Sequence, residues 1–246
     1  MKVSAVVVSH GSAAELAELL PALRPQVDEL VVIANVPGSA PPWIATIEND
    51  RPLGFAANLN KGFALTDGDA LLSVNPDAVP APGAVATMAE FMTAHARCGV
   101  VGPKMVFPDG SLQPSRRRFP TVSGTIVRRT PLRKLVPQRR HFHLDEPAAR
   151  EPVEVDWMLG GFLLLRRAML VELGGFDERF RLYGEDIDLQ YRAAKAGWER
   201  WYVPDAVVRH VHQAETDKRW LTRRTLWHWA GVVRFVRKHP ERLRAP

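Results

Sequence analysis

The chain has little of what secreted or membrane-spanning proteins carry. It contains one cysteine, Cys98, in 246 residues, which excludes an intrachain disulfide and favours a reducing compartment. No apolar run approaches the roughly 18 to 20 residues that a membrane span needs. The apolar stretch SAVVVS near the N-terminus is too short for a signal peptide, and His10 and Glu15 follow it closely. We therefore expect a cytoplasmic protein.

Several motifs of nucleotide and nucleophile chemistry are also missing. The sequence has neither the GxGxxG spacing of dinucleotide-binding proteins nor the GxxxxGK[ST] spacing of P-loop proteins. It shows no local signature of a Ser/His/Asp or Cys/His catalytic group. Cys98 lies in an apolar run, which predicts an inert thiol in a buried strand. Dinucleotide binding, P-loop binding and cysteine catalysis are therefore unsupported.

Basic residues are in excess and are unevenly distributed. The formal net charge is +6 and the sequence pI is about 9.8. The excess gathers at 116–119, 128–129 and 133–143, and again from Lys218 to the end. Such clusters suit nucleic acid, anionic lipid or a phosphorylated small molecule, and composition alone does not choose among them.

Short β-branched runs alternate with helical patterns in the first hundred residues. The predicted strands are KVSAVVVS, DELVVIA, WIATIEN, DALLSV and CGVVGPKMVF, and the predicted helices between them are SAAELAELLPALR, GFAANLNKGFAL and PGAVATMAEFMTAHA. The first of these helices places Leu16, Leu19, Leu20 and Leu23 on one stripe. Alternating strands and helices predict a doubly wound α/β fold.

The second half divides into a loop-like region, further α/β elements and a tail. Proline, arginine and turn residues dominate 107–152, which we predict to be a flexible loop region. Regular patterns resume after this region. VEVDWMLGGFLLLRR predicts a pair of strands, RAMLVELGG and GEDIDLQYRAAKAG each predict a helix, and WYVPDAVVRHVH predicts a further strand. We predict one domain over residues 1–215 and a basic, Trp-rich helical tail over 216–246.

A buried strand runs directly into Asn75-Pro76-Asp77. In open α/β sheets, ligands bind beyond the carboxyl ends of the strands. A carboxylate and an amide oxygen at that place can bind a divalent cation such as Mg²⁺. An Asn-Pro-Asp turn that simply ends the strand explains the same three residues.

Acidic and histidine pairs supply further candidates. Glu185 and Asp186 begin a predicted helix, where one of them can act as a general base or both can simply compensate the helix dipole. Asp188, four residues before Arg192, is better explained as a structural partner. His210 and His212 share one face at the end of a strand, where they bind a metal or phosphate or are merely solvated.

The stretch GFAANLNKG follows a predicted strand and carries amide and lysine side chains. Asn58, Asn60 and Lys61 can contact a nucleotide, and an ordinary capped helix accounts for them equally well.

Taken in order, these fragments resemble a known family. The segments that carry the resemblance are RPLGFAANLNKGF, LLSVNPDAVP, GPKMVFPDGSLQPSRRRFPT, VDWMLGGFLLLRRAMLVELGGFDERF and LYGEDIDLQYRAAKAGW. The chain resembles the inverting, GT-A-fold glycosyltransferases of family 2, in particular their bacterial rhamnosyltransferase-like branch. The resemblance runs from VSAVVVSHGS to about VRHVHQ, and it implies a mixed α/β sheet flanked by helices.

The resemblance implies a role for each candidate residue. Asp186, next to Glu185, looks like the base that deprotonates the acceptor hydroxyl. Asp77 and His210 look like ligands of Mg²⁺ or Mn²⁺ under the diphosphate of a sugar nucleotide. The donor-binding set is Ser9, Asn35, Asn58, Asn75, Asp77, Gly160 and Gly161. The acceptor-binding set is Arg116, Arg117, Arg118 and Trp157, within or beside the 107–152 region.

One position departs from the family pattern. Members commonly have an acidic residue after the second strand that contacts the nucleotide, and here Ala34-Asn35 stands there. Asn35 then takes over part of the contact, or recognition of the base and ribose is altered. The expected donor is dTDP-rhamnose, and the alternatives are a UDP-hexose or UDP-galactofuranose.

The tail and the arginine clusters bear on the acceptor. Trp and Arg alternate between 218 and 239, which predicts either a helix packed on the domain or an interfacial helix at an anionic membrane. A polyprenyl-pyrophosphate-linked acceptor would explain both features, with Arg116 to Arg118 around its pyrophosphate. We thus predict synthesis of a cell-surface glycan at the cytoplasmic face of the membrane. The alternative of a different class is a nucleic-acid-binding protein, but the sequence contains no recognisable nucleic-acid-binding motif.

Overall fold

The computed structural model describes residues 1–119, 149–211 and 223–243, and only the backbone of 223–229 and 243. Its core is a mixed sheet with the strand order β3-β2-β1-β4-β10-β6-β11-β5, and β8 pairs with β11. The strands are β1 (Val3–Ser9), β2 (Glu29–Ala34), β3 (Ile47–Glu48), β4 (Ala70–Val74), β5 (Ala78–Pro80), β6 (Cys98–Val106), β8 (Val153–Glu154), β10 (Phe162–Arg166) and β11 (Glu199–His210). A separate ribbon pairs β7 (Arg116–Arg117) with β9 (Trp157–Met158).

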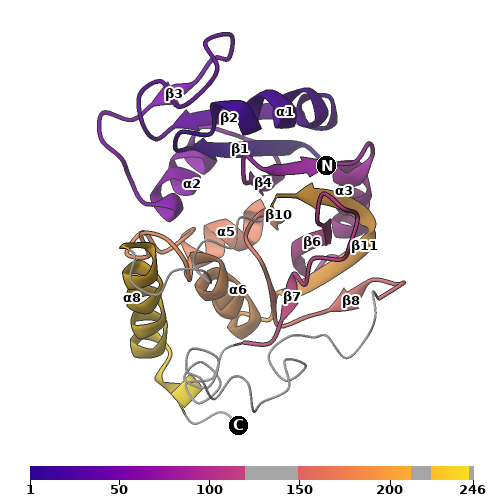
Figure 1. Cartoon of the computed structure of the whole chain (residues 1–246). Helices are drawn as coiled ribbons and strands as arrows, with labels where there is room; N and C mark the ends of the chain where they lie inside the picture. Colours follow the sequence, from indigo (N-terminus) through magenta and orange to yellow (C-terminus); the bar gives the residue numbers. More distant parts are fainter. Residues whose placement is uncertain (120–148, 212–222, 244–246) are drawn as a thin grey trace.

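Helices cover both faces of this sheet (Figure 1). They are α1 (Ala13–Leu23), α2 (Phe55–Ala64), α3 (Ala84–Ala94), α5 (Arg167–Leu173), α6 (Glu185–Lys195) and α8 (Arg223–Lys238), with short 3₁₀ turns at Arg24–Gln26 and Pro240–Leu243. No helix in the described ranges combines the length and the hydropathy that crossing a bilayer requires.

The periodic segments fold as their patterns predict. Leu16, Leu19, Leu20 and Leu23 of α1 are all buried against the sheet. The central strands β1 and β4 are buried along their whole length, as continuous apolar runs in parallel strands should be. Residues 43–49 are the exception, because only Ile47 and Glu48 pair as a strand and Trp43 is exposed.

The antiparallel strand β10 gives the sheet its mixed character. It lies between β4 and β6 and is antiparallel to both, whereas β6 and β11 run parallel to each other. Gly160 and Gly161 immediately precede it, so that β10 begins at the edge where β4 ends, with Phe162 opposite Val74. The polar residues that follow β4 are thereby brought beside this glycine pair.

The C-terminal helix α8 stands beside α6 (Figure 1), and a buried carboxylate links the two. Asp188 of α6 is fully buried and accepts hydrogen bonds from Arg192 Nε at 2.8 Å, Lys238 Nζ at 2.9 Å and His239 Nε2 at 2.9 Å. Phe235 of α8 packs edge-on against Tyr191 of α6. The predicted Asp188–Arg192 pair is confirmed, and the described part of the tail packs on the domain.

We expect Asp188→Asn to lower the free energy of unfolding by about 3 kcal/mol, because it removes a fully buried charge from its partly buried cationic partners Arg192 and Lys238. Urea unfolding followed by circular dichroism measures the change. Asp205→Asn, which alters an exposed aspartate of β11, serves as the control and should cost less than about 0.5 kcal/mol. Equal effects of the two substitutions would contradict the assignment of Asp188 as the link.

Some sequence predictions fall outside the described residues. They are His212, Trp220 and Leu221, the arginine clusters at 128–129 and 133–143, and the central part of the predicted loop region, 120–148. The described start of that region, 107–119, forms a turn at 107–110, a β-bridge between Val106 and Leu112, and strand β7.

Candidate active site

The Asn75-Pro76-Asp77 turn brings Asp77 to the end of β11. The backbone N–H of Ala78 donates to the carbonyl of Asn75 at 3.1 Å, so the chain reverses and β5 pairs with β11. His210, the last residue of β11, lies opposite Ala78 in this pairing. Its Nε2 is consequently 3.3 Å from Asp77 Oδ1. Two residues that are 133 positions apart in the sequence thus present a carboxylate and an imidazole to the same space.

Asp77 and His210 are the metal ligands predicted from the sequence, and their geometry can be compared with the needs of a divalent cation. Ligand atoms that share one small divalent cation lie roughly 3 Å apart, so their 3.3 Å separation fits a common ion. Within the described ranges, no cluster of three or more His, Cys, Asp or Glu side chains could hold a metal by itself. Mg²⁺ and Mn²⁺ are commonly held by one or two protein ligands, with phosphate oxygens and waters completing the shell. The residues present therefore fit a cation that binds together with a diphosphate.

Gly160 and Gly161 connect this pair to the acidic pair of α6. The N–H of Gly160 donates to Asp186 Oδ2 at 3.0 Å, and the carbonyl of Gly161 accepts the N–H of Asn75 at 2.8 Å. A Cβ on Gly160 would lie 3.0 Å from the Asp186 Cβ. One on Gly161 would lie 3.4 Å from both Asn75 Nδ2 and His210 Cε1. The missing side chains therefore permit the two halves of the site to approach each other.

The first turn of α6 holds Glu185 and Asp186 in different surroundings. Tyr183 and Gly184, with φ of 68° and 97°, turn the chain into the helix. Asp186 is partly exposed, and its Oδ1 accepts the N–H of Ile187 at 2.8 Å. Glu185 is buried, and its Oε2 has no hydrogen-bond partner among the residues that the structure describes. Asp186 can therefore reach a ligand, whereas Glu185 cannot be solvated.

Burial alters the acidity of both carboxyl groups. Desolvation, reinforced by the neighbouring Asp186 charge, raises the pKa of Glu185 to about 8. Desolvation also raises the pKa of Asp186, although the N–H groups of Ile187 and Gly160 and the charge of Arg117 act in the opposite direction. A carboxylate whose pKa is raised toward neutrality is a stronger base than an ordinary aspartate, as general-base catalysis near pH 7 requires.

The raised pKa of Glu185 predicts a pH-dependent stability. Because the folded protein binds a proton that the unfolded chain has released above about pH 4.5, stability is lost as the pH rises from about 4.5 to about 8. Glu185→Gln removes this loss, and the variant should be more stable than the wild type by on the order of 2–4 kcal/mol at pH 8. Urea unfolding at pH 5, 6.5 and 8 tests this. Glu90→Gln, at an exposed glutamate of α3, should have the same pH dependence of stability as the wild type. If the stability difference between Glu185→Gln and the wild type does not change with pH, the explanation is wrong.

The predicted acceptor residues lie on the β7–β9 ribbon. Arg117 is paired with Trp157, and its guanidinium lies 5.4 Å from the centre of the indole ring. Trp157 is 5% exposed and donates through Nε1 to the carbonyl of Arg118 at 2.7 Å, so the indole fixes the ribbon. Arg116 lies over Tyr202, and Arg118 is exposed. The charge of Arg117 contributes to lowering the pKa of Asp186, so this arginine lies within electrostatic range of the candidate base.

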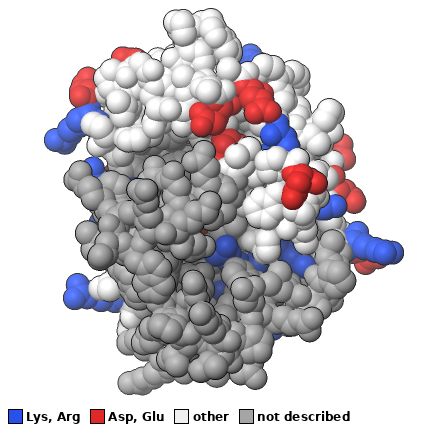
Figure 2. Space-filling view, in the orientation of Figure 1, with Lys and Arg blue, Asp and Glu red and all other residues white. Residues whose placement is uncertain are grey.

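Charge on the molecular surface is mixed on this side of the protein. Figure 2 shows acidic side chains gathered in the upper half of the face, while basic side chains also appear around its centre, next to residues drawn in grey. Basic side chains of the described residues are thus visible near the centre of this face.

Three other predicted donor residues form a separate, inward-facing cluster. The hydroxyl of Ser9 is buried and donates to the carbonyl of Ser39. Asn35 binds the backbone of Leu53 twice, accepting its N–H at 2.8 Å and donating to its carbonyl at 3.1 Å. Asn58 donates to Asn35 Oδ1 at 3.1 Å and is itself buried. These side chains fix the loops around the ends of β1 and β2, so a direct side-chain contact with the donor stays a prediction.

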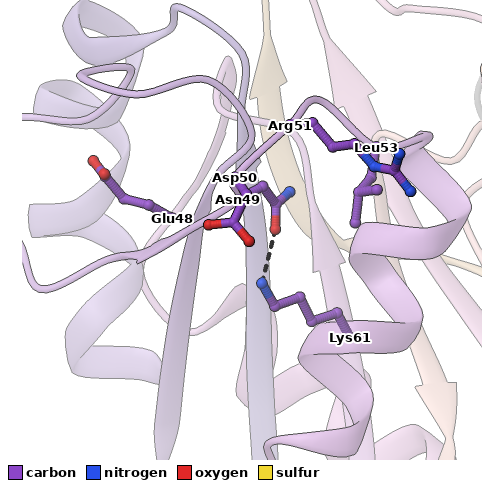
Figure 3. A pocket seen from close by; sticks show the side chains of 6 residues that line it. All are labelled: Glu48, Asn49, Asp50, Arg51, Leu53 and Lys61. Carbon is purple, nitrogen blue, oxygen red and sulfur yellow. Dashed lines mark hydrogen bonds between the residues drawn. The ribbon is translucent and has the colours of Figure 1, made fainter.

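A cavity of about 330 Å³ opens beside this cluster, between the end of β3 and α2 (Figure 3). Its lining residues are Glu48, Asn49, Asp50, Arg51, Leu53 and Lys61. Lys61 Nζ donates to Asn49 Oδ1 at 2.7 Å, and Asn49 in turn donates to Asn58 Oδ1 at 2.7 Å. None of the predicted catalytic or metal-binding residues lines this cavity.

Sequence reasoning missed Asn49 and Gln113. Asn49 completes the asparagine cluster, and the Gln113 Oε1 lies 2.9 Å from Nδ1 of His210. The signal for Asn49 was its position as the last residue of a predicted strand. Gln113 stood within a quoted family segment, but nothing in its neighbours indicated a partner almost a hundred residues away. Asn60, by contrast, holds the backbone of Phe176 and has a structural role.

Comparison with known proteins agrees with the fold. The sequence profile described as "Glycosyltransferase like family 2" matches residues 4–231. An N-acetylglucosaminyl-diphospho-decaprenol L-rhamnosyltransferase of Mycobacterium tuberculosis is 31% identical over 83% of this chain and 71% of its own length. The rhamnosyltransferase WbbL of Escherichia coli is 36% identical over 33% of this chain and 31% of its own length.

Solved structures share the fold at low sequence identity. GalNAc-T7, solved with UDP, GalNAc and Mn²⁺, is 17% identical with a TM-score of 0.66, and the alignment covers 100% of this chain and 52% of that one. The mannosyltransferase PcManGT of Pyrobaculum calidifontis, solved with GDP-Man and Mn²⁺, is 17% identical with a TM-score of 0.56, covering 98% of this chain and 72% of that one. The chain thus spans about half the length of the first of these proteins.

The mixed sheet, its flanking helices and these structural neighbours define the GT-A fold. More narrowly, the chain belongs to glycosyltransferase family 2, and it is similar to the rhamnosyltransferases of that family. Family membership favours the transferase over the nucleic-acid-binding hypothesis.

Proposed function

We propose that this chain transfers rhamnose, with inversion, from dTDP-rhamnose to a polyprenyl-diphosphate-linked acceptor in the synthesis of a cell-surface glycan. The observation that carries the chemistry is the junction at Gly160-Gly161, which sets Asp186 beside Asn75, Asp77 and His210. The proposed identities of the sugar and the acceptor are supported by the relative from Mycobacterium tuberculosis, which is named as an N-acetylglucosaminyl-diphospho-decaprenol L-rhamnosyltransferase.

The donor diphosphate is proposed to bind at Asp77 and His210. These two side chains would hold Mg²⁺ or Mn²⁺, which offsets the negative charge that develops on the leaving nucleotide diphosphate. Two structural neighbours were solved with Mn²⁺ and a nucleotide or nucleotide sugar, which supports the choice of cofactor. Gly160 and Gly161, which let the two halves of the site approach each other, are proposed to line the sugar with their backbone.

Asp186 is proposed to remove the proton of the acceptor hydroxyl. Its Oδ2 is oriented by the Gly160 N–H and its Oδ1 by the Ile187 N–H, so the carboxylate has one fixed position. As the acceptor oxygen forms its bond to the anomeric carbon, the bond from that carbon to the diphosphate breaks, and the proton passes to Asp186. A single displacement from the face opposite the leaving group inverts the anomeric centre.

Arg116, Arg117 and Arg118 are proposed to bind the acceptor diphosphate. Arg117 acts electrostatically on Asp186, so an anionic group bound by these arginines would sit close to the candidate base. The division into a catalytic domain, residues 1–215, and a basic tail that meets anionic lipid at the inner membrane face belongs to the same proposal. Co-sedimentation with anionic vesicles tests the membrane contact.

A transfer assay decides the donor. Purified protein is incubated with Mn²⁺, a short polyprenyl-diphosphate-GlcNAc acceptor, and dTDP-rhamnose, UDP-galactofuranose or UDP-glucose, and the product is detected by mass spectrometry. We expect product from dTDP-rhamnose and none after addition of EDTA. Product from a UDP-sugar alone would keep the transferase and replace the donor. If neither a product nor metal-dependent binding of UDP or dTDP is found, the proposed function fails.

A further inference from the structure

The two ring nitrogens of His210 face different side chains. Nε2 faces Asp77 Oδ1 at 3.3 Å, whereas Nδ1 lies 2.9 Å from Oε1 of Gln113. Both His210 and Gln113 are buried, at 5% and 3% exposure, so this second contact lies inside the protein. A buried side-chain contact of this length to a candidate metal ligand is the geometry of an orienting hydrogen bond.

Gln113 is held rigidly by the segment that follows β6. The backbone N–H of Gln113 donates to the carbonyl of Met105 at 2.9 Å, and Val106 forms a bridge with Leu112. Asp109 closes the turn between them by accepting both the N–H and the hydroxyl of Ser111. The backbone of Gln113 is therefore held on a short hairpin that follows β6, and from there the side-chain oxygen reaches His210.

The partner of Nδ1 determines the state of Nε2. An amide oxygen only accepts hydrogen bonds, so a neutral His210 facing Gln113 Oε1 carries its proton on Nδ1. Nε2 then presents a lone pair on the side of Asp77, as a metal ligand must. The opposite orientation of the amide would place the proton on Nε2, where it would point at Asp77 and block a shared cation.

We propose that Gln113 is a positioning residue that fixes His210 in its Nδ1–H tautomer and thereby prepares Nε2 to bind a divalent cation together with Asp77. The proposal rests on the function proposed above as far as the cation is concerned. The tautomer itself is a property of the protein alone. The two parts can consequently fail separately.

Nitrogen-15 NMR of the metal-free protein at pH 8 tests the tautomer. Two-bond correlations from the ring protons distinguish Nδ1–H from Nε2–H, and His210→Gln assigns the signals. We expect the Nδ1–H form in the wild type and a shift toward the Nε2–H form in Gln113→Met, which keeps the side-chain length but removes the acceptor. An Nε2–H tautomer in the wild type would overturn the proposal, whatever the protein binds.

Calorimetric titration with Mn²⁺ and dTDP, and with Mn²⁺ and UDP, tests the consequence for the metal. Loss of an outer hydrogen bond of a ligand histidine commonly costs 10- to 100-fold in metal affinity, which is the loss expected for Gln113→Met. Gln113→Glu keeps an acceptor for Nδ1–H and should remain within about threefold of the wild type.

A matched control separates orientation from general destabilisation. Gln26 is a glutamine whose amide links Ala22, Ala81 and Val85, away from the candidate metal pair. Gln26→Met should destabilise the fold without changing the affinity for Mn²⁺ and nucleotide. If Gln113→Met binds as tightly as Gln26→Met, or if Gln113→Glu is as weak as Gln113→Met, the positioning role is wrong. If the wild type binds no metal–nucleotide complex, the proposed function fails, and the tautomer measurement still decides the role of Gln113.

Discussion

Asp186→Asn is expected to lower the turnover number for sugar transfer by on the order of 10²–10⁴, the range that a general base contributes. Asparagine retains the shape of the side chain and an acceptor for the Gly160 N–H, but it cannot take a proton. The affinity for Mn²⁺ and nucleotide should therefore stay within about threefold of the wild type. Single-turnover transfer and calorimetric titration measure the two quantities.

The pH profile provides an independent check on the same residue. Burial raises the pKa of Asp186, so the rate constant for transfer should fall as the pH drops through this raised value and the base becomes protonated. In Asp186→Asn the residual rate should lose this acidic limb, while Glu90→Gln should retain it. A variant with a normal rate would exclude Asp186 as the base. If the residual rate of Asp186→Asn still falls at low pH, the fall is caused by the protonation of another group.

The fold could be predicted from local patterns because each main element carries its own period. The buried stripe of α1 and the continuous apolar runs of β1 and β4 depend on neighbours in sequence and on burial, and both are visible without coordinates. The break at Gly160-Gly161 and the strand after it were predicted in the same way. The strand predicted over residues 43–49 was too long, because only Ile47 and Glu48 pair with the sheet and the apolar residues before them do not.

The arrangement of the site could be predicted only in part. Asp77 and Asp186 could be predicted as candidates because Asp77 follows a strand and Asp186 begins a helix. At these positions a carboxylate can bind a cation or act as a base. Their connection through Gly160 depends on where antiparallel β10 enters the sheet, which is a long-range pairing. Gln113 and His210 likewise meet only because the hairpin after β6 folds over β11.

The donor side stays a prediction. Ser9, Asn35 and Asn58 were assigned to the donor through the family resemblance, and all three have polar side chains. The structure uses their side chains to tie loops together, with Asn35 bound to the backbone of Leu53 at both ends of its amide. A polar residue after a strand can serve the loop or the ligand, and sequence does not separate these uses, since both require the same hydrogen-bonding groups.

Asp77→Ala is expected to weaken the metal-dependent binding of the donor nucleotide by on the order of 100-fold or more. Changes to the outer hydrogen bonds of metal ligands already cost 10- to 100-fold, so the loss of a carboxylate ligand should cost at least the upper part of that range. The fold should survive, because Val211 donates to the backbone carbonyl of Asp77, which the alanine keeps. The side chain is 28% exposed and its removal opens no core cavity.

EDTA makes this prediction specific to the cation. Titrations with dTDP should show that the wild type in EDTA binds as weakly as Asp77→Ala in Mn²⁺, and that the variant is insensitive to EDTA. The affinity of His210→Ala for dTDP in Mn²⁺ should lie between those of the wild type and Asp77→Ala, since Asp77 would remain to hold the ion. A variant that binds nucleotide tightly and still responds to EDTA would place the metal elsewhere. Because Asp77 supplies the only full negative charge of the Asp77–His210 pair when the imidazole is neutral, its loss should outweigh that of His210.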